Sequence, residues 1–180
     1  MTESHQTKQG VLYLIICAAP PAQCMQDFIT NAQAAGWDVC VIATPQATRF
    51  INMPELANLT GHIVRSDYKL PGEADPLPKA DVIVVLPATF NTLNKWVLGI
   101  GDTLATSILC ESLGRGSPPI IAVPYLKLDL ANHPAFHKSI ALLKEYGVHI
   151  LYEPEKYPSP LLMPWEVILD EAQMAFSDVK

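Results

Sequence analysis

The sequence predicts an α/β fold in which helices cover both faces of a doubly wound, mainly parallel sheet. Four short and nearly continuous apolar runs predict strands that are buried on both faces, which is typical of parallel strands. Segments with helical spacing of apolar residues separate these runs, and strands that alternate with helices usually form parallel sheets. We place the four strands at Val11–Cys17, Trp37–Ala43, Val82–Leu86 and Ile120–Val123.

The segments between and after these strands carry the predicted helices. They are expected at Met25–Ala32, around Phe50, across Thr92–Leu113, at Pro134–Tyr146 and at Trp165–Phe176. Gly99 and Gly101 interrupt the third pattern, so it predicts two helices or a bend. Ile63–Val64 and Val148–Leu151 are expected to be brief additional strands, whereas Ser66–Lys79 is rich in Pro and Gly and predicts an irregular loop.

Composition narrows the class of protein. With 180 residues, of which 49% are hydrophobic and 17% charged, the chain has enough apolar material for one globular core. We expect a disordered lead-in at 1–10 and one domain at 11–180, with a Pro-rich loop at 152–164 before a C-terminal helix. The polar lead-in does not resemble a secretion signal, and no apolar run approaches the roughly 20 residues of a membrane span. A cytoplasmic protein without a membrane partner is therefore expected.

The charged residues and cysteines exclude further classes. Twelve Lys and Arg against 18 Asp and Glu give a net charge of −6 without a basic run, which argues against a nucleic-acid partner. Four cysteines without a Cys-x-x-Cys pair indicate free thiols. His133 and His137 are four residues apart and could hold a metal, but Pro134 makes His133 a better capping residue. No metal site is predicted.

Ligands of open parallel sheets bind beyond the carboxyl ends of the strands, so the turns that follow the strands are the places to examine. The turn after Cys17 lacks the Gly-x-Gly-x-x-Gly spacing of nicotinamide dinucleotide sites. The turn Thr44-Pro45-Gln46-Ala47-Thr48 offers two hydroxyls at a helix start. This turn predicts either an anion site or ordinary capping by Thr44.

Two longer motifs follow the third and fourth strands. Residues 87–92 read Pro-Ala-Thr-Phe-Asn-Thr and are followed by Lys95 and by Gly-Asp-Thr-Leu at 101–104; residues 124–134 form the second motif. They resemble the Pro-Ala-Ser-Ala-Asn-Thr, Lys, Gly-x-x-Asp-Asn-Leu and Pro-x-Met-Asn-x-x-Met-Trp-x-Asn-Pro motifs of the flavin-containing cysteine decarboxylases. That superfamily includes phosphopantothenoylcysteine decarboxylase and the peptidyl-cysteine decarboxylases of lantibiotic synthesis. The resemblance extends from about Val11 to about Leu151.

The resemblance implies a Rossmann-like flavoprotein fold and a trimer-based homo-oligomer that holds FMN between its subunits. The positions that match the family's cofactor site are Ala19, Pro20, Thr44, Gln46, Thr89, Phe90, Asn91, Thr92 and Tyr125. Large apolar groups between Phe90 and Trp96 lie near the end of the third strand and are expected to contribute to a subunit interface, Trp96 foremost.

The chain also departs from the family's pattern at its catalytic and binding positions. Pro20 stands where the family usually has a hydroxyl, and Phe90, in place of a small residue, would either stack on an aromatic ligand or fill the place of the flavin ring. The segment before Ala80 contains no histidine, and the family's substrate-binding Asn is Lys127. Glu73, Lys127 and Asp102 are the remaining catalytic candidates.

Three functions follow from the motifs and these departures. The first is an FMN-binding flavoprotein with redox or group-transfer chemistry other than cysteine decarboxylation. The second is a non-catalytic oligomeric protein for binding or regulation, with a degenerate flavin pocket. The third is an atypical FMN-dependent decarboxylase that uses Glu73 or Lys127 in place of the missing groups. The substrate class, small molecule or peptide, stays open.

Overall fold

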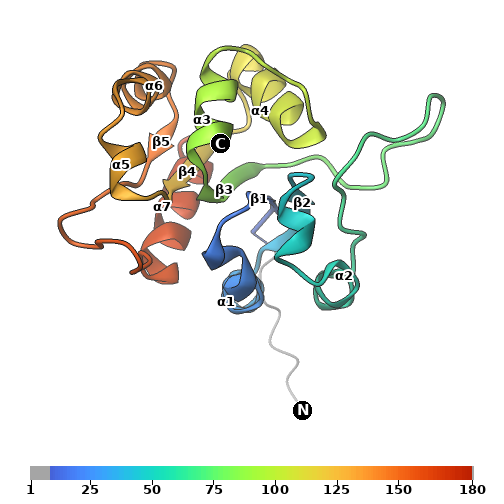
Figure 1. The fold of residues 1–180 in the computed structure, drawn as a ribbon. Coiled ribbons are helices and arrows are strands. Elements are labelled where there is room, and N and C mark those ends of the chain that lie inside the picture. Colours follow the sequence, from blue (N-terminus) through green and yellow to red (C-terminus); the bar gives the residue numbers. More distant parts are fainter. Residues whose placement is uncertain (1–8, 180) are drawn as a thin grey trace.

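A parallel five-stranded sheet forms the centre of the protein, whose computed structural model describes residues 9–179 (Figure 1). The strand order is β2-β1-β3-β4-β5, and every pair of neighbouring strands is parallel. The predicted fold class is thereby confirmed. The strands are β1 Val11–Ile16, β2 Asp38–Ala43, β3 Val82–Ala88, β4 Ile120–Pro124 and β5 His149–Ile150.

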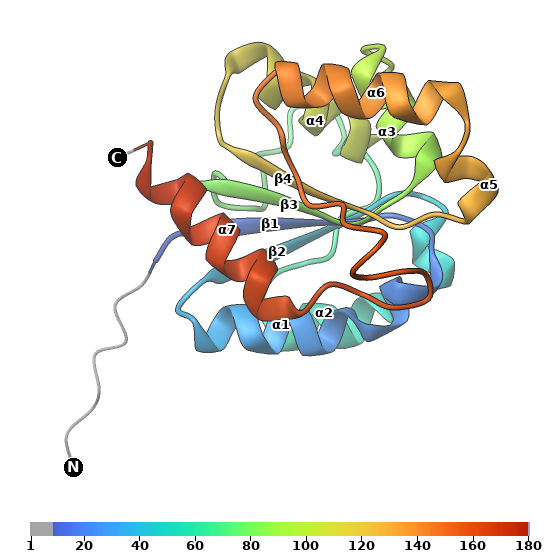
Figure 2. The ribbon, with the colours of Figure 1, turned by 90° about the vertical axis from the view of Figure 1, so that its left-hand side faces the viewer.

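Two layers of helices enclose the sheet (Figure 2). On one face lie α1 Met25–Ala34, α2 Met53–Thr60 and α7 Trp165–Ser177. On the other face lie α3 Phe90–Val97, α4 Leu104–Arg115, α5 Leu128–Ala131 and α6 Pro134–Glu145. The short 3₁₀ helices η1 Pro20–Cys24 and η2 Ala47–Arg49 begin the first two connections. None of the helices in residues 9–179 is long and apolar enough to cross a membrane.

The sheet separates two hydrophobic cores, which explains the continuous apolar runs in the sequence. Successive side chains of a strand point to opposite faces. Leu12 and Leu14 therefore pack against α1 and α7, whereas Ile15 and Cys17 pack under α3 and α4. Because both faces are covered, nearly every position of the central strands has to be apolar.

Two glycines divide the long helical pattern after β3 into α3 and α4. Gly99 adopts a φ of 71°, which favours glycine. A Cβ at Gly101 would lie 2.7 Å from the Ser107 hydroxyl, so a side chain does not fit there. Helix α4 then begins with a capping box in which Thr103 and Thr106 each bond the other's backbone N–H. The break returns the chain to the carboxyl edge of the sheet.

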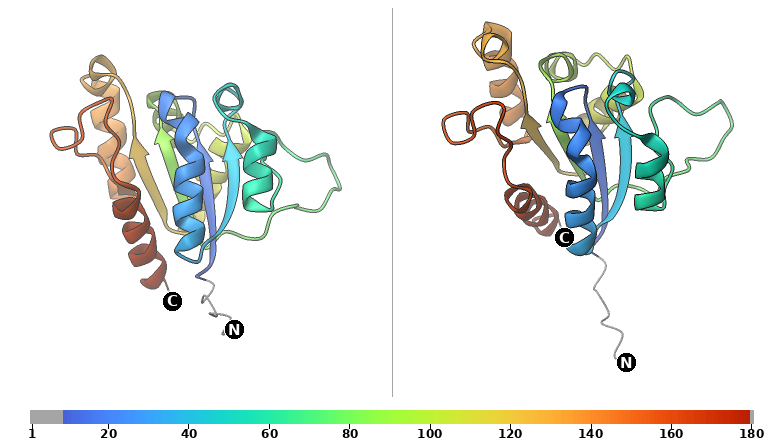
Figure 3. Two further views of the ribbon diagram at one scale, coloured as in Figure 1. Left: turned by 90° about the horizontal axis from the view of Figure 1, so that it is seen from below. Right: turned by 60° about the horizontal axis from the view of Figure 1, so that its bottom comes forward.

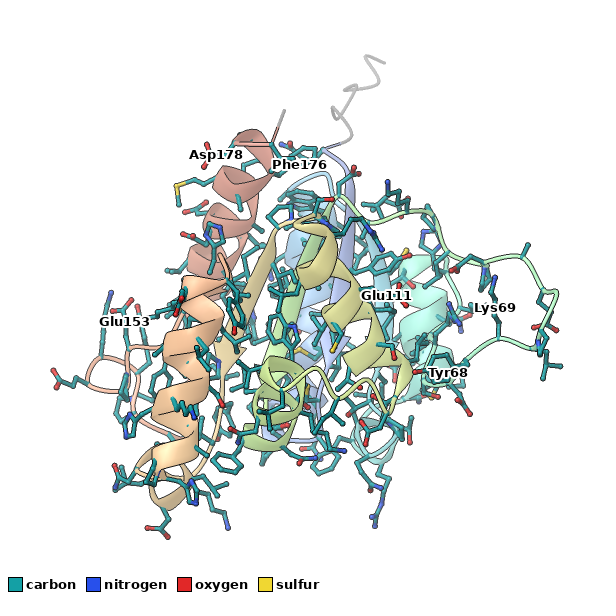
Figure 4. The ribbon with its side chains drawn as sticks, turned by 90° about the horizontal axis from the view of Figure 1, so that it is seen from above. Tyr68, Lys69, Glu111, Glu153, Phe176 and Asp178 are labelled. Atoms are coloured by element: carbon teal, nitrogen blue, oxygen red, sulfur yellow. The ribbon has the colours of Figure 1, made fainter. Side chains whose placement is uncertain are left out.

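The predicted strand at Ile63–Val64 is wrong. The next residue, Arg65, instead forms a single parallel bridge to Ile42, at the outer edge of β2. Two apolar residues without a longer run do not pair as a strand here, because the chain then leaves the sheet as the irregular segment 66–79. This segment projects sideways from the domain (Figure 3). Tyr68 and Lys69 lie on it (Figure 4).

The expected interface role of Trp96 is also wrong. Its side chain is 1% exposed and packs in the core between α3 and α4. Its indole N–H is the buried side-chain donor that has no partner within residues 9–179. Of the predicted lead-in, residues 1–8 lie outside the described residues. Gln9 donates a backbone hydrogen bond to Gly36.

The four cysteines should differ sharply in reactivity, because a thiol reacts as its accessible thiolate. Cys17 and Cys40 are 0% exposed, and burial, with a smaller contribution from the Asp38 charge, raises the pKa of Cys40 to about 12. Burial also raises the pKa of the half-buried Cys110. In the folded protein at mildly alkaline pH, a thiol reagent should therefore modify Cys24 first, as stopped-flow absorbance would measure.

Cys24→Ser should remove this fast phase, and denaturant should expose the other three thiols to the reagent. Rapid modification of Cys40 in the folded protein would contradict the burial described above.

Candidate functional site

A cleft of about 630 Å³ lies at the carboxyl edge of the sheet, where the chain leaves β1, β2, β3 and β4. Its volume falls within the roughly 300–1,000 Å³ of small-molecule sites. All nine residues that match the family's cofactor positions line it, together with Lys127 and Asp102. The structure thus gathers segments that are far apart in the sequence around one space.

The sheet topology explains why the cleft forms here. β1 and β3 are neighbours, but β1 leads into α1 on one face whereas β3 leads into α3 on the other. The two connections diverge at this edge, and such a switch point leaves a crevice between them. Thr89 to Thr92 begin α3 in the middle of the cleft. Tyr125 lies beside them, because its backbone N–H donates to Ala88 at 2.9 Å.

Several polar side chains of the cleft have no hydrogen-bond partner within residues 9–179. They are Thr44, Gln46, Asn91 and Tyr125. Capping by the Thr44 side chain, one of the two expectations for this turn, is therefore not observed; the Ala47 N–H donates instead to the Thr44 carbonyl oxygen. These hydroxyl and amide groups can bond a ligand without breaking a protein contact.

A second set of polar groups is organised by internal hydrogen bonds. The hydroxyls of Thr89 and Thr92 lie 3.1 Å apart. Beneath them lies the Cys17 thiol, whose pKa is raised by burial and lowered to a smaller extent by hydrogen bonds with Thr92 and Thr89. Cys17 therefore stays a neutral thiol and supports the threonine pair from below.

The lining carboxylate is already paired. Asp102 accepts a hydrogen bond from Lys95 at 2.5 Å and a longer one from Thr106 at 3.4 Å. The Lys95 hydrogen bond holds the pKa of Asp102 below its usual value. A carboxylate that is stabilised in its ionised form is a poor proton acceptor, so Asp102 is suited to positioning Lys95 rather than to general base catalysis.

The end of the cleft next to β4 is apolar. The residues that follow β4 give the cleft two apolar side chains, Leu126 and Leu130, and one cation, Lys127. The Phe90 ring meets the His133 ring edge-on, with centroids 5.4 Å apart. Phe90 is half-buried and lines the cleft, which stays open beside it.

Glu73 does not lie at this site. It belongs to the projecting segment, where its carboxylate accepts the Leu70 N–H at 3.0 Å, and it lines a different cavity beside Tyr68. Within this chain it is therefore not a base for chemistry in the cleft. Its position shortly before β3 makes it a candidate in the sequence, but the sequence does not reveal that segment 66–79 projects away from the domain.

His133 caps α6 as Pro134 suggested, because its Nδ1 accepts the Ala135 N–H at 3.0 Å. Residues 9–179 contain no group of three or more His, Cys, Asp or Glu side chains arranged to hold a metal ion.

Several lining residues lie outside the cofactor positions that the sequence predicts. They include Ala18, Pro45, Lys95, Thr103, Thr106, Leu126 and Leu130. Thr106 could have been found from the Thr-x-x-Thr spacing of the capping box. Leu130 could not, because the four-residue helix α5 has no clear signal in the sequence.

Comparisons with known proteins agree with this geometry. A family profile described as "Flavoprotein" matches residues 2–179. The coenzyme A biosynthesis bifunctional protein CoaBC of Bacillus subtilis (strain 168) is 30% identical over 129 residues, which are 68% of this chain and 31% of CoaBC. The chain thus spans about a third of the length of this curated relative.

Solved structures show the same fold. The FMN-dependent cysteine decarboxylase SpaF superposes with a TM-score of 0.77 at 21% identity, over 94% of this chain and 98% of SpaF. The epidermin biosynthesis protein EpiD from Staphylococcus aureus gives 0.74 at 24% identity, over 89% and 99%. These structures confirm the flavoprotein fold that the resemblance implies, and the family profile shows that the chain belongs to the Flavoprotein family.

Proposed function

We propose that this protein binds FMN in the cleft and uses it for redox or group-transfer chemistry other than cysteine decarboxylation. The observation that carries the proposal is the convergence of unpartnered polar side chains on one open cleft at the switch point of the sheet. Membership of the Flavoprotein family and the FMN-dependent enzymes among its structural neighbours support it.

The residues present suit a flavin nucleotide. Thr44 and Gln46, beyond β2, offer a hydroxyl and an amide toward a phosphate. Asn91 and the Thr89–Thr92 pair, in the middle of the cleft, can bond the heteroatoms of a flat ring. The hydroxyl residue that the family usually has at position 20 would offer a side-chain donor and a backbone donor to a phosphate. Pro20 offers neither, so phosphate binding depends more on Thr44 in this chain.

When bound, FMN would supply the hydride or electron transfer, and the protein's residues would bind, orient and shield the reactants. Lys95 is held in place by Asp102 and can donate a hydrogen bond into the cleft. The apolar side chains of Phe90 and Leu126 line part of the cleft and would shield the reactants there. No histidine lines the cleft within residues 9–179. This supports chemistry that does not need an imidazole to accept a proton.

A non-catalytic binding protein is the second candidate. Its support is that the lining carboxylate is paired, so an obvious proton acceptor is missing. Turnover of any substrate by the FMN-loaded protein would exclude it.

The first prediction concerns FMN itself. Purified protein should be yellow or become yellow with added FMN, and fluorescence titration should give the affinity. Asn91→Ala should weaken FMN binding by about three- to tenfold, which is the effect of losing one hydrogen bond. Asn58→Ala is the matched control, because Asn58 is exposed on α2 away from the cleft. Equal affinities of both variants, or no binding at all, would contradict the proposed site.

The second prediction is that the FMN-loaded protein does not decarboxylate a peptide with a C-terminal cysteine or the pantothenoyl-cysteine substrate. Asp102 is a poor base, Glu73 lies elsewhere, and Lys127 replaces the expected Asn. Loss of general base assistance alone typically costs about 10²- to 10⁴-fold in rate. Mass spectrometry after incubation should therefore detect only unchanged substrate. Decarboxylated product that disappears with Lys127→Ala would establish the third function instead.

The third prediction concerns assembly. We propose that the chain forms a trimer-based homo-oligomer with the cleft near a subunit interface, as the resemblance implies. Sedimentation velocity at micromolar concentration should show a species heavier than the 19.7 kDa monomer. A monomer at every concentration, with and without FMN, would rule the assembly out.

A further inference from the structure

Helix α6 packs against α3 on one face of the sheet, although none of its residues 134–145 lines the cleft (Figure 2). The first turn of α3, by contrast, lies in the middle of the cleft and presents Thr89, Asn91 and Thr92 there. Whatever holds this turn in place therefore acts on the groups that the proposed function assigns to FMN.

The start of α3 has no side-chain cap. The first backbone N–H groups of a helix have no partner within the helix, and a capping side chain commonly satisfies one of them. The side chain of the N-cap residue Thr89 makes no such hydrogen bond, whereas α4 begins with a complete capping box at Thr103 and Thr106. The first turn of α3 therefore depends more on contacts with other elements than the first turn of α4 does.

Two linked hydrogen bonds supply such a contact from α6. The Ser139 hydroxyl donates to Asn94 Oδ1 at 2.6 Å, and the Asn94 side-chain amide donates to the Phe90 carbonyl oxygen at 2.8 Å. A serine within a helix commonly bonds a carbonyl of its own helix one turn back. Ser139, which is 4% exposed, instead bonds across to α3.

These hydrogen bonds fix the orientation of the Asn94 side chain. An amide group carries an acceptor oxygen and a donor nitrogen. A flip would turn the Asn94 oxygen toward the Phe90 carbonyl oxygen, and two acceptors in contact repel each other. Breaking the other hydrogen bond would leave the buried Ser139 hydroxyl without a partner, which costs free energy. The link from Ser139 to Phe90 is therefore a firm connection between α6 and the first turn of α3.

We infer that Ser139 is a positioning residue of the cofactor site, which acts through Asn94 on the first turn of α3. Neither Ser139 nor Asn94 lines the cleft. Binding groups have to be held within about 0.5 Å of the productive geometry, and supporting hydrogen bonds commonly do this. The inference rests on the proposed function, in which FMN occupies the cleft.

Fluorescence titration with FMN compares Ser139→Ala with a matched control, Ser112→Ala. Ser112 is also 4% exposed, but it lies on α4 outside the cleft, and its hydroxyl has no hydrogen-bond partner within residues 9–179. Ser139→Ala should weaken FMN binding by about three- to tenfold, because the first turn of α3 loses its link to α6. It should also change the visible circular dichroism of the bound flavin. Ser112→Ala should leave both unchanged.

A double-mutant cycle tests whether the effect passes through Asn94. Asn94→Leu removes both hydrogen bonds, keeps a side chain of similar size and should weaken FMN binding at least as much as Ser139→Ala. Adding Ser139→Ala to Asn94→Leu should then reduce the affinity by less than about twofold, because the link is already broken. Thermal unfolding without FMN shows whether each variant is folded.

The possible outcomes are distinct. An unchanged FMN affinity in Ser139→Ala, even with a lower melting temperature, would show that the link only stabilises the fold and would overturn this inference. Equal weakening by Ser112→Ala would overturn it too, and so would independent effects of Asn94→Leu and Ser139→Ala that multiply in the double variant. In these cases FMN binding by the unaltered protein would still support the proposed function. Failure of the unaltered protein to bind FMN, seen as absence of flavin absorbance after gel filtration, would overturn the proposed function and this inference together.

Discussion

The opposite directions in which the chain leaves β1 and β3 are the constraint on which the site depends. These strands are paired from Leu12–Val82 to Ile15–Val85, which holds them side by side. Their connections nevertheless pack on different faces, because right-handed crossovers on either side of β1 place helices below and above the sheet (Figure 2). Neither connection covers the carboxyl edge of the sheet between the ends of β1 and β3. The cleft is therefore a consequence of topology, and its chemistry depends on the residues that follow each strand.

Much of the fold could be predicted from the sequence because burial on both faces leaves an unambiguous signal. The central strands are apolar at nearly every position, and Gly99 and Gly101 mark the break between α3 and α4. One failure concerns the type of structure, namely the strand expected at Ile63–Val64, and another concerns the direction of a side chain. Trp96 is apolar and lies near a strand end, but only the packing of α3 shows that it points into the core.

The candidate site was partly predictable for a similar reason. The residues after each parallel strand must meet at one edge, so Thr44, Thr89 and Tyr125 could be expected to lie near one another. Which side chains of the cleft are free to bind a ligand depends on hydrogen bonds that the sequence does not reveal. The hydrogen bond between Lys95 and Asp102 is an example. The contact between Phe90 and His133 joins residues 43 positions apart (133 − 90 = 43) and depends on how α5 and α6 fold back.

The single bridge at Arg65 has a consequence for how copies of the chain can associate. Its backbone accepts a hydrogen bond from Ala43 at 2.7 Å and donates one to Val41 at 3.1 Å, so it occupies the ladder groups at the end of β2. The opposite edge strand, β5, is only two residues long. Neither margin offers a long row of free peptide groups, and such rows are the templates for edge-to-edge aggregation. Association by continuing the sheet is therefore disfavoured.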